Sequence, residues 1–171
     1  MEELGRVSPE EIQAAKKHPV IVILDDVRSM HNVGSTFRTC DAFAIEELYL
    51  CGYTPAPPHR DIHKTALGAT ETVAWKNFTT TIEAVTAARA AGYKILAVEQ
   101  AHGSTMLNTL NWQHEKVALV FGNEVTGVND EVLAAADGCI EIPQWGAKHS
   151  LNISVSVGIV LWEMVRGNSK M

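Results

Sequence analysis

The sequence is short of cysteine, of long apolar runs and of basic residues, and each shortage excludes a class of protein. It has three cysteines, Cys40, Cys51 and Cys139, an odd number without a C-x-x-C pair, so neither a disulfide framework nor a zinc cluster is expected. Unpaired thiols favour a reducing compartment, and we expect a cytoplasmic protein. No apolar run approaches the roughly 20 residues that cross a bilayer. The polar, acidic start differs from a signal peptide, so no membrane association is expected.

Acidic residues outnumber basic ones, 20 Asp and Glu against 14 Lys and Arg, which gives a net charge of −6. Proteins that bind nucleic acids usually carry a basic excess, because they neutralise phosphates. Broad, non-specific affinity for nucleic acid is therefore not expected. Any RNA partner would have to be bound by a local basic patch or with the help of an accessory protein.

Predicted strands and helices alternate along the 171 residues. Residues 20–24 form a continuous β-branched and leucine run, as expected of a strand covered on both faces. The pattern predicts one α/β domain over residues 1–171, with a mainly parallel sheet and helices on both faces. Residues 1–19 form a short helical extension in this prediction. Further strands are expected at 47–51, 94–98, 117–121 and 139–142, and helices at 8–17, 33–44, 82–91, 130–136 and 150–166.

The last predicted helix, residues 150–166, is apolar on more than one face. It is either a central helix of the core or a helix whose second face packs on a partner subunit. The proline-rich stretch 53–60 cannot form regular structure and is expected to be an exposed loop and a candidate substrate contact.

The loops that follow the predicted strands are candidate ligand sites, because parallel α/β sheets bind ligands at the carboxyl ends of their strands. The first loop leads into residues 32–39, where Asn32 can cap the following helix. Arg38 projects beside the apolar stripe of that helix. A surface ion pair with Asp41 is the structural alternative for this arginine.

The segment 122–127, Gly-Asn-Glu-Val-Thr-Gly, lacks the lysine that a P-loop places after its second glycine, so ATP or GTP hydrolysis is not expected. No G-x-G-x-x-G follows a strand, which leaves a nicotinamide or flavin site without its fingerprint. Ser150 has an alternative as a plain helix N-cap. His59 and His63 have no obvious further ligands, so no metal site is expected. Hydrolase motifs are not found.

Three of these loops together resemble the motifs of the SpoU (TrmH-like) family of SPOUT RNA methyltransferases. The family patterns Asn-x-Gly-x-x-x-Arg-Thr, Gly-Asn-Glu-x-x-Gly and Ile-Pro-x-x-Gly-x-x-x-Ser-Leu-Asn match residues 32–39, 122–127 and 142–152. The resemblance runs from about residue 20 to 165. Three motifs in order at strand ends are far more specific than any one of them.

The resemblance implies a C-terminal deep trefoil knot, in which residues 122–150 fold around the cofactor and the last helix is threaded through. Chains normally avoid threading loops, so nothing in the residue pattern itself predicts a knot. The resemblance also implies a homodimer in which residues of the first motif complete each site near the partner. The apolar last helix suits such an assembly.

For the chemistry, the resemblance implies methyl transfer from S-adenosylmethionine to a ribose 2′-hydroxyl of RNA, with no metal. It places the cofactor against backbone groups, where adenine edges can be read without polar side chains. The implied cofactor residues are Val98, Gly122, Ile142, Ser150 and Leu151, and the implied catalytic residues are Arg38, Asn32, Glu124 and Asn152.

Arg38 is the residue expected to carry the reaction, either by activating the 2′-hydroxyl or by binding a neighbouring phosphate as a charged fork. An arginine pKa of about 12.5–13.8 makes proton abstraction near pH 7 costly, so assistance from a substrate phosphate stays open. Asn32 and Asn152 would orient Arg38 or the ribose. Glu124 would hold groups of the first motif.

RNA affinity in an acidic chain needs a local patch, which a dimer cleft could gather, or an accessory RNA-binding protein. Gln144 and Ser156 depart from residues that are common in the family and mark a subgroup. The Ile-Pro-Gln-x-Gly segment, with Leu-Trp-Glu at 161–163, resembles members that act on the D loop of tRNA. We therefore expect tRNA, with ribosomal RNA and a non-catalytic, cofactor-binding RNA adaptor as alternatives. The expected RNA-binding patch is Arg28, Arg38, Arg60, Lys64 and Lys148.

Overall fold

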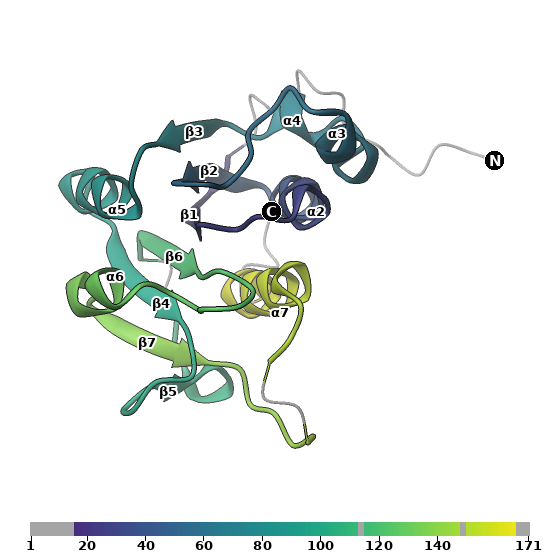
Figure 1. Ribbon diagram of the computed structural model, residues 1–171. Coiled ribbons are helices and arrows are strands. Elements are labelled where there is room, and N and C mark those ends of the chain that lie inside the picture. The colour runs from purple at the N-terminus through teal and green to yellow at the C-terminus, as the bar shows by residue number, and fades with distance from the viewer. Residues whose placement is uncertain (1–15, 113–114, 148–149, 167–171) are drawn as a thin grey trace.

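The centre of the molecule is a seven-stranded sheet, seen in the computed structural model, which describes residues 16–112, 115–147 and 150–166 (Figure 1). The strand order is β3-β2-β1-β6-β4-β7-β5, and every strand pairing is parallel. This confirms the predicted α/β fold with a parallel sheet. The strands are β1 (His18–Asp25), β2 (Ile45–Cys51), β3 (Trp75–Phe78), β4 (Lys94–Val98), β5 (Thr105–Met106), β6 (Val117–Phe121) and β7 (Gly138–Glu141).

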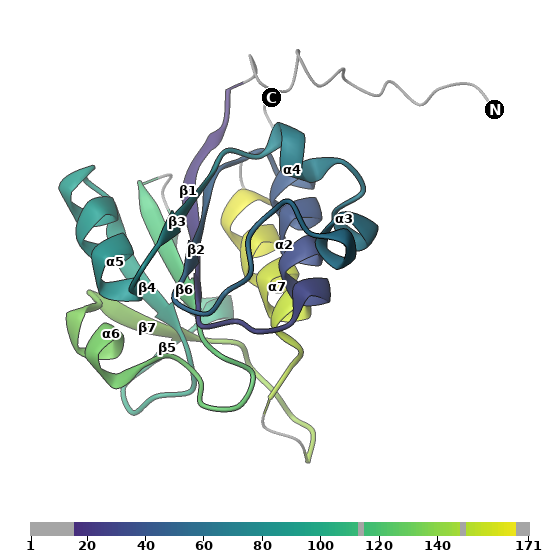
Figure 2. The same cartoon turned by 45° about the horizontal axis from the view of Figure 1, so that its top comes forward.

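Strand β1 is buried on both faces, as its unbroken apolar run predicts. Successive side chains of a strand point to opposite faces. The side chains of 20, 22 and 24 enter one apolar cluster, with α2, α3, α4 and α7, and those of 21 and 23 enter another, with α5 and α6. Helices therefore cover both faces of the sheet (Figure 2). The helices are α2 (Met30–Ala42), α3 (Arg60–Ala66), α4 (Ala69–Thr72), α5 (Thr81–Ala90), α6 (Asp130–Ala135), α7 (Ile153–Val165) and the 3-10 turn η1 (Leu107–Thr109).

Two predicted helix starts are wrong, and in both cases a different side chain caps the helix. Helix α2 is capped by Ser29, whose Oγ accepts from the Asn32 backbone N–H at 3.2 Å, so Asn32 lies inside the helix. Helix α7 is capped by Asn152, whose Oδ1 accepts from the Ser154 N–H at 2.9 Å, so Ser150 is not the cap. The predicted helix over 8–17 lies almost wholly outside the described residues. Its last two residues, 16 and 17, are not helical.

Helix α7 buries one apolar face in the core and exposes another. Its inner face packs beside α2 on one face of the sheet (Figure 2). Its outer face carries Val155, Ile159 and Trp162, whose side chains are 49%, 39% and 57% exposed. Contiguous exposed apolar side chains on a helix mark an interaction surface more often than a solvated one. The inner face confirms the interpretation as a core helix, and packing of the outer face on a partner subunit stays a prediction. No helix among the described residues has the length and apolar content to cross a bilayer.

Candidate functional site

A cavity of about 640 Å³ opens at the carboxyl ends of β4, β6 and β7. Register places Val98, the last residue of β4, beside Phe121, the last residue of β6, so the loops that follow these strands begin side by side. All five residues that we predict to hold a cofactor line this cavity, which we call the ligand cavity. They are Val98, Gly122, Ile142, Ser150 and Leu151.

One wall of the ligand cavity is the glycine loop, residues 122–127, which folds back on itself. The backbones of Asn123 and Gly127 exchange two hydrogen bonds of 2.9 Å. Gly122 allows this fold, because a Cβ at that position would lie 2.1 Å from the Gly127 carbonyl carbon and the Val128 nitrogen. The side chain of Asn123 anchors the loop to the end of β1 by donating to the Asp26 carbonyl at 2.7 Å. The loop therefore presents backbone groups in a fixed arrangement.

Three predicted catalytic residues form a continuous chain of hydrogen bonds at the edge of the cavity. Asn32 Nδ2 donates to Glu124 Oε1 at 3.1 Å, and Asn32 Oδ1 accepts from Asn152 Nδ2 at 3.1 Å. The Arg28 backbone N–H donates to Glu124 Oε2 at 3.4 Å. This polar chain joins α2, the glycine loop and the start of α7, which are the three segments of the sequence motifs.

The carboxyl of Glu124 is held in its charged form by the donors around it. Partial burial raises its pKa, but hydrogen bonds from its own backbone, from the Asn32 side chain and from the Arg28 and Ser29 backbones outweigh burial, so the pKa lies below the usual range. Glu124 is thus an acceptor that positions its neighbours. A carboxyl with a lowered pKa is a poor proton donor near neutral pH.

Arg38 lies on the exposed side of α2 and does not line the ligand cavity of its own chain. The alternative ion pair with Asp41 is not formed, and the Asp41 carboxylate accepts from the hydroxyl of Thr72. Within the described ranges, Arg38 makes no hydrogen bond or ion pair. Its guanidinium group is therefore available to a ligand or to a second chain.

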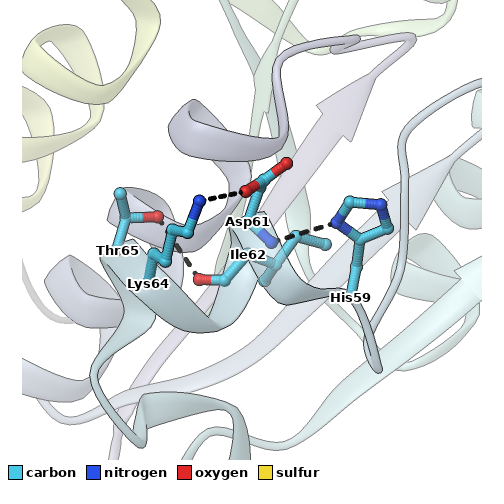
Figure 3. Close-up of polar contacts among 5 residues, drawn as sticks. All are labelled: His59, Asp61, Ile62, Lys64 and Thr65. Atoms are coloured by element: carbon cyan, nitrogen blue, oxygen red, sulfur yellow. Dashed lines mark hydrogen bonds and ion pairs between the residues drawn. The ribbon is translucent and has the colours of Figure 1, made fainter.

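Of the five predicted RNA-binding residues, Arg60 and Lys64 lie on α3, and Arg28 lies on the loop before α2. Lys64 Nζ contacts Asp61 Oδ1 at 2.7 Å, which offsets part of its charge (Figure 3). That lysine lowers the pKa of the Asp61 carboxyl. His59 is half-buried and caps α3 by accepting from the Asp61 N–H at 3.2 Å (Figure 3). Lys148 lies outside the described residues.

Glu99 lines the ligand cavity and was not predicted. Its Oε2 accepts from the Val128 N–H at 3.1 Å and lies against Gly127, so it supports the end of the glycine loop. The sequence feature that could have identified Glu99 is its position directly after strand β4, at the edge of the sheet where ligands bind. Gln144 and Ser156, the two departures from the family pattern, also line the cavity.

A parallel sheet with a cavity at the carboxyl ends of its strands, walled by a tight glycine loop and edged by amide side chains, defines an α/β protein that binds a small organic ligand. Within the described residues no cluster of side chains suits a metal ion. The site is built from backbone groups and a few fixed polar side chains.

The chain belongs to the SpoU rRNA Methylase family, whose sequence model matches residues 19–162. It is 31% identical over 157 residues to a tRNA (guanosine(18)-2'-O)-methyltransferase of Aquifex aeolicus, covering 91% of this chain and 73% of the relative. It is 29% identical over 161 residues to the Thermus thermophilus enzyme of that name, covering 94% and 81%.

The fold is also similar to that of an AdoMet-bound rRNA methyltransferase from Sinorhizobium meliloti, with a TM-score of 0.82 at 30% identity. The match covers 95% of this chain and 61% of the Sinorhizobium chain. The present chain therefore spans about three fifths of that longer protein.

Proposed function

We propose that the protein is an S-adenosylmethionine-dependent RNA 2′-O-ribose methyltransferase that acts on tRNA. The observation that carries this proposal is the polar chain, which joins three separate sequence motifs at the mouth of one cavity. Curated relatives named as tRNA 2'-O-methyltransferases favour tRNA over ribosomal RNA. The family description and the Sinorhizobium protein keep ribosomal RNA as the second candidate.

The ligand cavity fits S-adenosylmethionine in size and in chemistry. Its volume of about 640 Å³ lies within the roughly 300–1,000 Å³ of small-molecule sites. Val98, Gly122, Ile142 and Leu151 would hold the molecule through backbone groups, and Ser150 lies at the same wall. When bound, the cofactor supplies a methyl group already activated by a positively charged sulfur.

The protein's own part in the reaction is alignment and proton handling. Asn32 and Asn152 fix each other and would orient the acceptor ribose, while Glu124 keeps the Asn32 amide in one orientation. Arg38 would bind the phosphate next to the target ribose or assist in removing the hydroxyl proton. Its high intrinsic pKa favours the phosphate role.

We infer a homodimer from two features of the single chain, the position of Arg38 and the exposed apolar face of α7. Arg38 lies outside the cavity of its own chain, and the outer face of α7 exposes Val155, Ile159 and Trp162. Pairing two chains through α7 would cover that face and bring Arg38 to the partner's cavity. An accessory RNA-binding protein would compensate for the net charge of −6 if the dimer cleft alone does not.

Two further expectations accompany this function. The first is a deep trefoil knot, in which the segment 122–150 encloses the path of α7; similarity to the family supports it. The second is a cytoplasmic location, which free thiols at Cys40, Cys51 and Cys139 suit.

The test is methyl transfer from labelled S-adenosylmethionine to total RNA, followed by digestion to nucleosides. We expect label in a 2′-O-methylnucleoside of tRNA, loss of turnover in Arg38→Ala, and unchanged cofactor binding in that variant. Label on a base would contradict the proposal. Cofactor and RNA binding without any turnover by the unmodified protein would support the adaptor instead.

Mixed dimers test where Arg38 acts. Arg38→Ala is mixed with Ser150→Trp, which fills part of the cavity, and each variant alone is inactive. Random pairing of equal amounts of the two variants makes half of the dimers mixed. If Arg38 serves the partner's cavity, each mixed dimer has one intact site out of two, so about a quarter of full activity returns. If it serves its own cavity, no activity returns.

A further inference from the structure

Tyr53 is an aromatic residue two positions after the end of β2, and it is 78% exposed. A tyrosine ring carries a large apolar face that is normally buried or used for binding. The guanidinium carbon of Arg28 lies 5.9 Å from the centroid of this ring, within the range of a cation–π contact. The pair therefore presents a flat, cationic surface to solvent.

The backbone around Tyr53 is held by hydrogen bonds, although its side chain is exposed. The Tyr53 N–H donates to Asp26 Oδ1 at 2.8 Å. The next residue, Thr54, is buried, and its Oγ1 accepts from the Val27 N–H at 3.0 Å and donates to the Leu24 carbonyl at 3.2 Å. A ring on such a fixed base loses little conformational entropy when a ligand stacks on it.

Arg28 connects the Tyr53 ring to the polar chain at the edge of the cavity. Arg28 contacts the tyrosine ring through its guanidinium group and Glu124 through its backbone N–H, at 3.4 Å. Glu124 in turn accepts from Asn32 at 3.1 Å. A polynucleotide whose ribose lies at Asn32 thus has the Tyr53 ring within reach of a neighbouring nucleotide.

A flat aromatic face with an adjacent arginine and no enclosing pocket suits an unstacked nucleobase. Base-aromatic stacking tolerates any base and does not depend on a basic excess. This property addresses the difficulty of the net charge of −6, because part of the affinity would come from contacts that need no positive charge. We propose that Tyr53, supported by Arg28, is a stacking platform for an unpaired nucleobase of the RNA that flanks the acceptor ribose. The inference rests on the proposed function.

The experiment compares the unmodified protein with Tyr53→Leu, Tyr53→Phe and Arg28→Ala. The probes are an in vitro transcribed tRNA pool, a single-stranded oligoribonucleotide and an RNA duplex of equal length. RNA affinity is measured at several salt concentrations, together with KM and kcat for methyl transfer, S-adenosylmethionine affinity and oligomeric state.

We expect Tyr53→Leu to raise Kd for tRNA and for the single strand, and KM for tRNA, by about 5- to 150-fold, the range of one base stack. Duplex binding, cofactor affinity and the salt dependence of RNA binding stay unchanged in that variant. Tyr53→Phe restores most of the affinity because it keeps the ring. Arg28→Ala weakens binding and lowers the salt slope by about 1.

Turnover by the unmodified protein together with an unchanged Kd and KM in Tyr53→Leu would refute the platform and leave the proposed function intact. Equal losses for single strand and duplex would refute it as well. A change of oligomeric state in Tyr53→Leu would assign the ring to a protein interface instead. Absence of both RNA binding and turnover in the unmodified protein would refute the proposed function, and the platform with it.

Discussion

Replacing Gly122 with alanine is the sharpest perturbation of the ligand cavity that the structure offers. The added methyl group would lie 2.1 Å from the Val128 nitrogen and from the Gly127 carbonyl carbon. Carbon atoms pack best at about 3.5–4.0 Å, so one segment must move by more than about 1 Å. The obstructing atoms belong to backbone, and no side-chain rotation relieves the clash.

The cost can be worked from the contacts that would change. Overpacking a filled site costs about 1–3 kcal/mol. Opening the glycine loop also strains the two 2.9 Å hydrogen bonds between Asn123 and Gly127, each worth about 0.5–1.5 kcal/mol. We expect Gly122→Ala to lower the free energy of unfolding by about 2–4 kcal/mol. At roughly 2–4 °C per kcal/mol for a domain of this size, Tm falls by about 5–15 °C.

The assay is thermal unfolding by circular dichroism, together with calorimetric titration of S-adenosylmethionine. Gly138→Ala in β7 is the matched control, because its added Cβ would lie 3.5 Å from Leu96 Cδ2, an ordinary contact. We expect the control to change Tm by less than about 2 °C and Gly122→Ala to lose most cofactor affinity. A Gly122→Ala protein with the control's Tm and full cofactor affinity would refute the close approach of the two ends of the glycine loop.

Three further predictions concern the polar chain, acid stability and the thiols. Asn32→Ala removes the amide that joins the glycine loop to α7, and we expect a loss of about 1–2 kcal/mol in urea unfolding and at least a tenfold loss of methyl transfer. The Asp137 carboxyl has a pKa below its usual range, chiefly because it accepts from the Ile95 backbone N–H. The ionised carboxyl therefore stabilises the fold at neutral pH, and this stabilisation is lost as the pH falls through the folded pKa. Asp137→Asn should therefore be less stable than the unmodified protein at pH 7, and the two unfolding free energies should converge in acid. Burial raises the pKa of Cys51 to about 12, so iodoacetamide at pH 8 should leave this thiol unlabelled in the native protein. The half-buried Cys139 should react first, and mass spectrometry measures both rates of labelling.

The long elements of the fold were predictable from sequence because their apolar patterns span several turns or a whole strand. Strands β1, β4 and β6 and helix α5 lie within a residue or two of the predicted positions. The short elements α3, α4, β3 and β5 were missed. They contain two to seven residues, too few for a periodic pattern, and they depend on packing against their neighbours.

The site was predictable to the extent that its residues belong to sequence motifs. Asn32 lies within hydrogen-bonding distance of both Glu124 and Asn152, although 120 positions separate the two asparagines. What could not be predicted was the capping role of individual side chains. A serine and an asparagine three residues apart compete for the same helix start, and only the tertiary structure decides between them.

The amide of Asn152 makes two kinds of contact at once. Its oxygen caps α7 and its nitrogen donates to Asn32, so the first turn of the helix and the edge of the cavity share one side chain. Local unfolding of that turn must break the polar chain, and anything that fixes the polar chain must hold the turn closed. Amide hydrogen exchange at Ser154 and Val155 should therefore slow when a ligand fills the cavity. The exchange rate at the start of α7 would then measure whether the cavity is occupied.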